Sequence, residues 1–151
     1  MSRIDPEDYA PLAPEFEQGL IASIRAAPFP AFLGLEKEAV RRDYARMRLR
    51  YRPELNQPAG IVHGGAIASL IDTAVVGAVL SAYTPETMPK TIVTIDMHVH
   101  YLNAAREVDL ICHAAVRRRG RQIVFLEAEV IDDDGRDIAH GELSYMIVAA
   151  T

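Results

Sequence analysis

The chain has 151 residues, of which half are hydrophobic and a quarter are charged, and its formal net charge is −5. This composition is typical of a folded globular protein, and the acidic balance argues against a nucleic-acid-binding surface. No apolar run approaches the ~20 residues needed to cross a bilayer, and the first residues lack the apolar core of a signal peptide. We therefore expect a single cytoplasmic domain over residues 1–151 that is not associated with a membrane.

The N-terminal third is predicted to form an arm, one short helix and two strands. Residues 1–13 are rich in proline and show no periodicity, which predicts a loose arm. Residues 14–26 place apolar side chains at helical spacing, and the prolines at 28 and 30 are expected to end that helix. Two strands are predicted over residues 35–41 and 44–52. The core is expected to span residues 32–149, after the arm and short helix of residues 1–31.

The rest of the chain predicts one long helix followed by strands. From Gly65 to about Ala82, apolar residues recur every three or four positions, which predicts a buried helix that is apolar nearly all round. Strand-like stretches follow, with a hairpin around Gly120 and a turn at DDDG (132–135). This order indicates an α+β fold in which an antiparallel sheet wraps round one long central helix. Because that helix has more apolar surface than one copy can cover, we expect a homodimer.

Asp72 is the one residue that burial of this helix does not explain. It lies eight residues after Gly64, which is about 12 Å along a helix axis. The N–H groups of Gly64 and Gly65 are expected to be unpaired at the helix N-terminus, where they suit a negatively charged atom. On its own, Asp72 could instead cap a neighbouring loop or pair with an arginine such as Arg50.

The sequence resembles the hot-dog fold acyl-CoA thioesterases of the phenylacetate-degradation type. The resemblance covers about residues 32–149 and rests on the loop Asn-Gln-x-x-Gly-x-x-His-Gly-Gly (56–65), the acidic residue nine positions after its histidine, the strand TIDMHVHYL (94–102) and the hairpin RRRGRQIVFLEAEV (117–130). It implies a hot-dog fold and hydrolysis of an aryl or medium-chain acyl-CoA at a dimer interface. No cofactor is expected, because coenzyme A is part of the substrate.

Thioester hydrolysis needs donors for the oxyanion and a carboxylate that attacks the carbonyl or deprotonates water. The N–H groups of Gly64 and Gly65 suit the first role and Asp72 suits the second. Both groups can act on one carbonyl only if Asp72 comes from a second copy, since about 12 Å of helix separates Gly64 from Asp72 within one chain. Two roles are open for His63, which either orients the substrate carbonyl or makes a hydrogen bond across the interface.

The resemblance implies two further polar positions. An amide six residues before the histidine is expected to hold the carbonyl or the attacking water. That spacing falls on Gln57, while Asn56 lies one residue earlier, so both are candidates. Thr94 aligns with a serine or threonine that assists the water in related enzymes, although a β-branched residue is also ordinary in a strand.

Four arginines surround Gly120, at positions 117, 118, 119 and 121. Side chains at such a turn can converge on the phosphates of coenzyme A, although a solvated turn is an equal alternative. Strand alternation allows only some of them to face the same side. We select Arg119 and Arg121 as the candidates for binding coenzyme A.

His98 and His100 share one face of a predicted strand, and His113 lies on another strand. No third ligand at zinc-like spacing accompanies them, and the resemblance implies no metal, so no metal site is expected. A polar face that contains Thr94, Asp96, His98 and His100 could instead join two dimers into a homotetramer.

Two other functions are compatible with this fold. One is a non-catalytic hot-dog module that binds an acyl-CoA or an acyl carrier protein without turnover. The other is a related dehydratase, which we rank last because such enzymes favour a His and Asp pair in a different arrangement. Release of free thiol from a panel of acyl-CoA thioesters distinguishes the hydrolase from the binding module.

Overall fold

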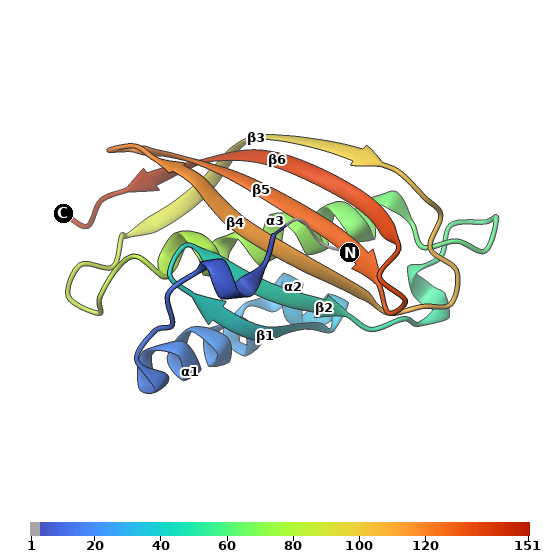
Figure 1. The fold of residues 1–151 in the computed structure, drawn as a ribbon, viewed down its shortest axis with the longest axis horizontal. Coiled ribbons are helices and arrows are strands. Elements are labelled where there is room, and N and C mark those ends of the chain that lie inside the picture. Colours follow the sequence, from blue (N-terminus) through green and yellow to red (C-terminus); the bar gives the residue numbers. More distant parts are fainter. Residues whose placement is uncertain (1–3) are drawn as a thin grey trace.

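The computed structural model describes residues 4–151, and its centre is a six-stranded antiparallel sheet curved around one long helix, α3 (Gly64–Leu80) (Figure 1). In sheet order the strands are β1 (Leu35–Arg41), β2 (Tyr44–Leu49), β4 (Leu110–Arg119), β5 (Ile123–Asp132), β6 (Asp137–Val148) and β3 (Thr91–Tyr101). The predicted α+β architecture is confirmed. No helix among the described residues is long and apolar enough to cross a membrane.

The sheet lies close to α3 because two glycines allow it. A Cβ added to Gly77 would lie 2.9 Å from the Cβ of Ala45 on β2. A Cβ added to Gly141, on β6, would lie 2.9 Å from the side chain of Ile71 on α3. Any larger residue at either position would push the helix and the sheet apart, so these glycines permit the dense packing of a protein interior.

The N-terminal arm is ordered along the outer face of the sheet, the face turned away from α3 (Figure 1). Ile4 is buried with Tyr44 and Ala115, and the ring of Tyr9 stacks on that of Tyr44 with centroids 5.2 Å apart. Pro11 forms a β-bridge with Arg41. The prediction of a loose arm is therefore wrong for residues 4–13, because isolated anchor residues hold the arm without any periodic pattern. Residues 1–3 of the predicted arm lie outside the described residues.

The predicted first helix is confirmed as α1 (Pro14–Ser23), which continues as a 3-10 turn over Ile24–Ala26. A further helix, α2 (Pro28–Leu33), was not predicted. Its first proline occupies the opening helical position, where the missing N–H costs nothing, so this proline starts a helix as well as ending one. The second predicted strand is shorter than expected, since β2 stops at Leu49 and Pro53–Leu55 form a 3-10 turn.

Lys37, on β1, is almost completely buried, and its Nζ donates a hydrogen bond of 2.9 Å to the carbonyl oxygen of Leu20 on α1. Burial lowers the pKa of Lys37 to about 8. In an unfolded chain the pKa of lysine is about 10.4. Between these two pH values the unfolded chain binds more protons than the folded chain, so the contribution of Lys37 to stability rises with pH.

We expect the substitution Lys37→Met to remove this pH dependence. Between pH 8 and pH 10.4 the free energy of unfolding of the parent should rise by about 2.5 kcal/mol relative to that of Lys37→Met. One pKa unit corresponds to about 1.4 kcal/mol, and the lysine is half protonated in the folded chain at the lower pH and in the unfolded chain at the upper pH. Urea unfolding of both proteins across this range measures the shift. Burial raises the pKa of Cys112, so the contribution of this thiol to stability falls as pH rises. Both proteins contain Cys112, and its effect therefore cancels when their free energies of unfolding are subtracted. A difference that does not change with pH would contradict the prediction.

Candidate active site

His63 caps the N-terminus of α3. Its Nδ1 accepts a hydrogen bond of 2.8 Å from the backbone N–H of Gly65, which leaves the proton of the neutral ring on Nε2. The prediction that both glycine N–H groups are unpaired is therefore wrong for Gly65. Among the described residues no partner accepts from the N–H of Gly64, so this group is the free donor at the positive end of the helix.

Gly64 is held from its other side by Tyr101, which the sequence did not single out. The Tyr101 hydroxyl donates a hydrogen bond of 2.8 Å to the carbonyl oxygen of Gly64. A Cβ added to Gly64 would lie 3.2 Å from the Tyr101 ring, which is a tight contact. The geometry therefore favours glycine here and fixes the direction of the first peptide of α3.

A cavity of about 300 Å³ adjoins Gly64, and its lining includes Gln57, Tyr101 and Asn103. Gln57 belongs to a tight turn, in which its side-chain oxygen accepts from the N–H of Ala59. Asn56 does not line this cavity. Its Nδ2 donates to the hydroxyl of Tyr51, 3.0 Å away, and its Oδ1 is buried without a partner among the described residues. Of the two candidate amides, Gln57 is thus the one placed beside Gly64.

The carboxylate of Asp72 is anchored by two hydroxyl groups. Thr94 donates to Oδ1 over 2.8 Å, and Tyr145 approaches the same oxygen at 2.6 Å. Burial, followed by the hydrogen bond with Asp72, raises the pKa of Tyr145, so this phenol stays protonated as a donor. Oδ2 receives no hydrogen bond from the described residues, which leaves one carboxylate oxygen for a reactant.

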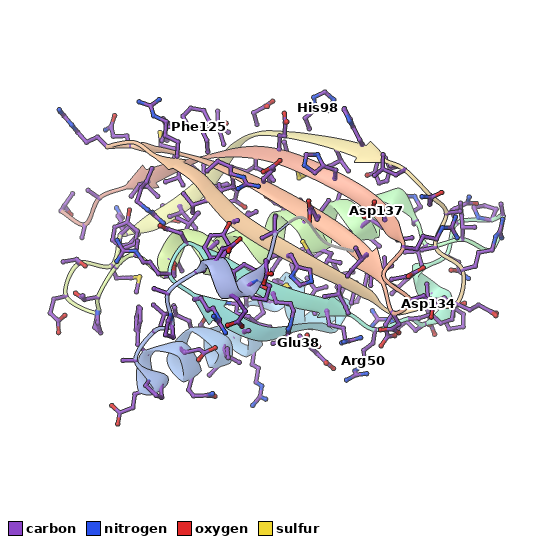
Figure 2. All side chains as sticks on the ribbon, in the orientation of Figure 1. Glu38, Arg50, His98, Phe125, Asp134 and Asp137 are labelled. Carbon is purple, nitrogen blue, oxygen red and sulfur yellow. The ribbon has the colours of Figure 1, made fainter. Side chains whose placement is uncertain are left out.

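Asp72 is not paired with Arg50, as one reading of the sequence allowed. Arg50 binds Glu36 and Asp109, with shortest N–O distances of 2.7 and 3.5 Å. Figure 2 shows Arg50 at the lower edge of the molecule and His98 at the opposite edge, on β3. Asp72 therefore lies on α3 without a cation partner among the described residues.

A β-bulge in β3 brings Thr94 to Asp72. The register of β3 against β6 shifts between Thr94 and Asp96, so Ile95 is the extra residue. Because side chains alternate along a strand, one extra residue turns Thr94 toward α3 while Asp96 and His98 face outward. The predicted polar face of Thr94, Asp96, His98 and His100 is therefore wrong for Thr94.

The two arginine candidates lie in different surroundings. The guanidinium of Arg119 is 2.6 Å from the carboxylate of Asp43. It also donates hydrogen bonds to the carbonyl oxygens of Ala78 and Val79, so it caps the last turn of α3. This placement argues against a role for Arg119 in binding coenzyme A. Arg121 is exposed and lines a cavity of about 390 Å³ at the same end of α3.

The histidines have separate partners. Nε2 of His98 lies 3.2 Å from Nε2 of His100, and Nδ1 of His113 lies 2.9 Å from the hydroxyl of Tyr44. Burial is the largest cause that lowers the pKa of His113. In residues 4–151, no group of three or more His, Cys, Asp or Glu side chains is arranged to hold a metal ion.

Solved structures show that the curved sheet and central helix form the hot-dog fold. The PaaI protein of the Escherichia coli phenylacetic acid degradation operon matches with a TM-score of 0.79 and 19% identity, over 89% of this chain and 94% of that one. A thioesterase family protein of Silicibacter pomeroyi also matches with a TM-score of 0.79, at 24% identity, over 88% of this chain and 98% of that one. The predicted hot-dog fold is confirmed.

Relatives are also found by sequence. A Halobacterium salinarum protein that carries the provisional name of esterase is 33% identical over 97% of both chains. The medium/long-chain acyl-CoA thioesterase YigI of Escherichia coli is 28% identical over 80% of this chain and 85% of its own.

The thioesterase superfamily model matches residues 59–139, a range that is more than half of the chain and includes His63, Gly64 and Asp72. The chain therefore belongs to the thioesterase superfamily. The predicted class of enzyme, a thioester hydrolase, is confirmed at this level.

Proposed function

We propose that the protein is an acyl-CoA thioesterase, which hydrolyses an acyl-CoA to the free acid and coenzyme A at a site shared by two copies of the chain. The proposal rests on the placement of two groups, the free N–H of Gly64 and the anchored carboxylate of Asp72. Both lie in residues 59–139, which match the thioesterase superfamily, and eight residues of one helix separate them. That spacing is about 12 Å, too far for both groups to reach one carbonyl carbon. The name of the YigI relative supports acyl-CoA as the substrate.

In the proposed reaction, the thioester carbonyl accepts a hydrogen bond from Gly64 of one subunit. Asp72 of the partner subunit then attacks the carbonyl carbon or takes a proton from the attacking water through its free Oδ2. The C–S bond breaks, and coenzyme A leaves as a thiolate that takes up a proton. If Asp72 itself attacks, water then hydrolyses the acyl-aspartyl anhydride, which releases the free acid and restores the carboxylate. The negative charge that develops on the carbonyl oxygen is stabilised by the N–H of Gly64 and by the helix dipole. His63 acts as a positioning residue, because its bond to the N–H of Gly65 holds the first turn of α3. The reaction requires no cofactor.

The exposed edge of β3 supports a dimer. β3 is an 11-residue edge strand, and β6 is its single neighbour among the described strands, so its outer row of backbone N–H and C=O groups is available to another strand. Antiparallel pairing of two such edges would place two α3 helices antiparallel. Ala68 lies midway between Gly64 and Asp72, so a two-fold axis near Ala68 would bring each Gly64 to the partner's Asp72.

The outer face of the sheet supports a second contact between dimers. Val93, Phe125 and Met146 are exposed there, on β3, β5 and β6. The N-terminal arm packs on another part of this face, where Ile4 contacts Tyr44 of β2 and Ala115 of β4. Figure 2 shows Phe125 projecting from this face, on the same side as His98. A dimer of dimers that covers this apolar surface is our proposal for the tetramer.

Arg121 is the candidate ligand for the phosphates of coenzyme A. It lies beyond the C-terminal end of α3, whereas Gly64 lies at the N-terminal end. In an antiparallel dimer the arginine that approaches Gly64 is therefore the one from the partner subunit, as for Asp72. One substrate molecule would then contact Gly64 of one chain and two residues of the other.

The proposal is tested by following free thiol released from a panel of acyl-CoA thioesters and from matched N-acetylcysteamine thioesters, which lack the nucleotide. We expect turnover of the acyl-CoA substrates. Arg121→Ala should raise KM about tenfold for acyl-CoA only, because the substitution removes one charge-assisted contact. Arg118→Ala is the matched control, since Arg118 is also exposed at the turn but lines no cavity described here. Absence of turnover above background would overturn the proposed function.

Tyr145→Phe is expected to lower kcat about tenfold with little change in KM, because a hydrogen bond to a charged group contributes about 1.5–3 kcal/mol. The ring is buried, so its packing is kept while the donor to Asp72 is lost. Tyr44→Phe is the control, since this buried hydroxyl contacts His113 on the outer face instead. Equal kcat losses in the two variants would show that Tyr145 has only a structural role.

A further inference from the structure

A large apolar groove lies at the C-terminal end of α3, and the reaction proposed above does not use it. Its volume is about 850 Å³, and it is lined by α1 and by the end of α3 with the following loop, including Phe16, Gly19, Leu80, Tyr83 and Met88. Its size falls within the range of ligand pockets, roughly 300–1,000 Å³. Among the described lining residues, Glu15 alone carries a formal charge at neutral pH.

A row of partly buried residues leads from Asp72 to the groove along one face of α3. From Asp72 onward, the residues of α3 that are not fully buried are Asp72, Thr73, Val76 and Leu80. Asp72, Val76 and Leu80 follow at intervals of four residues, so their side chains lie in one row along the helix. Beyond Asp72 this row is apolar, and its last member lines the groove. Figure 1 shows α1 beneath this end of α3. Phe16 and Gly19 of α1 line the groove together with Leu80.

We propose that this groove holds the end of the acyl chain of the substrate, which makes medium- and long-chain acyl-CoA thioesters the preferred class. This inference rests on the proposed thioesterase function and names its substrate. The row from Asp72 to Leu80 covers about 12 Å of helix axis. Because C–C bonds of about 1.5 Å zigzag, an extended chain advances only about 1.25 Å per carbon, so roughly ten carbons span that length. An aryl acyl group would end beside Val76 and leave the groove empty.

All the residues in this path belong to one chain, the chain that supplies Asp72 and Arg121. The groove and the Arg121 cavity share Tyr83 and Met88, so in this proposal the acyl chain lies against α1 while coenzyme A bends back along the separate surface that carries Arg121. The path therefore follows from the described structure of a single subunit. Each methylene that leaves water for the groove is expected to raise kcat/KM about fourfold, until the groove is filled. The dependence on chain length should thus appear in kcat/KM for chains longer than about ten carbons, which are the first to reach Leu80 and the wall formed by α1.

Gly19 gives a sharp test, because it lines the groove and a Cβ added there meets no atom within 4 Å. Gly19→Leu should fill the groove without displacing the backbone, and Gly19→Ala should fill less of it. Alanine and leucine both favour a helix over glycine, so α1 is expected to remain folded. Gln18→Leu is the matched control, because Gln18 is exposed on the same helix but does not line the groove.

The measurement is kcat/KM for butyryl-, lauroyl- and palmitoyl-CoA with the parent and the three variants. We expect the lauroyl to butyryl and palmitoyl to butyryl ratios to fall about tenfold or more in Gly19→Leu, and less in Gly19→Ala. Gln18→Leu should keep the ratios of the parent. Turnover with ratios that Gly19→Leu does not change would overturn the groove assignment and leave the thioesterase function intact. A parent that hydrolyses no acyl-CoA would overturn both, and a change of oligomeric state in Gly19→Leu would show that the groove is an interface.

Discussion

Asp72→Asn is expected to lower kcat by about 10²–10⁴-fold, because the substitution removes the carboxylate that delivers the nucleophile. Asparagine keeps the size of the side chain and an oxygen that can accept from Thr94 and Tyr145. The fold and the KM for acyl-CoA should therefore change little. Steady-state hydrolysis, with thermal unfolding as a check on folding, measures both quantities.

The matched control is Asp96→Asn. Asp96 faces outward on β3, directly beyond the bulge that turns Thr94 inward, and it is exposed. Its substitution removes the same charge from the protein without touching the row of residues on α3. If Asp72→Asn hydrolyses acyl-CoA as fast as the parent and the control, the catalytic assignment of Asp72 is wrong.

Gly64→Pro is expected to lower kcat by about 10²–10³-fold, since it removes the single free N–H proposed to bind the oxyanion. Proline is well tolerated at this position, because Gly64 is the first residue of α3 and its N–H has no intrahelical acceptor. The preceding residue, His63, already has φ −62° and ψ 134°, a conformation compatible with a following proline. The substitution should therefore remove a donor and leave the helix in place.

Gly64→Ala is the control that separates this donor from crowding. Alanine introduces the same Cβ, which approaches the Tyr101 ring at 3.2 Å, but keeps the N–H. We expect alanine to reduce kcat much less than proline. Equal losses in the two variants would show that the contact with Tyr101 matters and that the N–H of Gly64 does not bind the oxyanion.

The sequence predicted the central helix and the hairpins well, because their apolar periodicity is long and regular. The buried face of α3 follows from its spacing of apolar residues, and Asp72 stands out against it. The hairpin at Gly120 is equally local, since a Cβ there would lie 2.8 Å from the carbonyl oxygen of Ile123. Such features depend on neighbouring residues alone.

Features that depend on distant residues could not be predicted in this way. The inward turn of Thr94 results from a bulge against β6, which alternation along β3 does not reveal. Tyr145 reaches Asp72 across 73 positions of sequence, and no local motif marks it. Tyr101 reaches Gly64 across 37 positions, and no local motif marks it either. Arg119 was selected as a candidate for binding coenzyme A, and its pairing with Asp43 could not be predicted because 76 positions of sequence separate the two residues.

We propose that each active site takes Gly64 from one chain and Asp72 from another. The most direct test of this proposal uses the two inactive variants, Asp72→Asn and Gly64→Pro, unfolded and refolded together in equal amounts. A mixed dimer would contain one site with both groups intact and one site with neither. Because half of randomly assembled dimers are mixed, we expect about a quarter of the parent activity to return.

Each variant refolded alone should stay at its own low level, which provides the baseline. Recovery to about a quarter of the parent activity is the result that the shared site predicts. A site built within one chain would recover nothing, since every chain in the mixture carries a defect. A mixture that forms mixed dimers but stays at the baseline would show that Gly64 of one chain and Asp72 of the other do not form one active site.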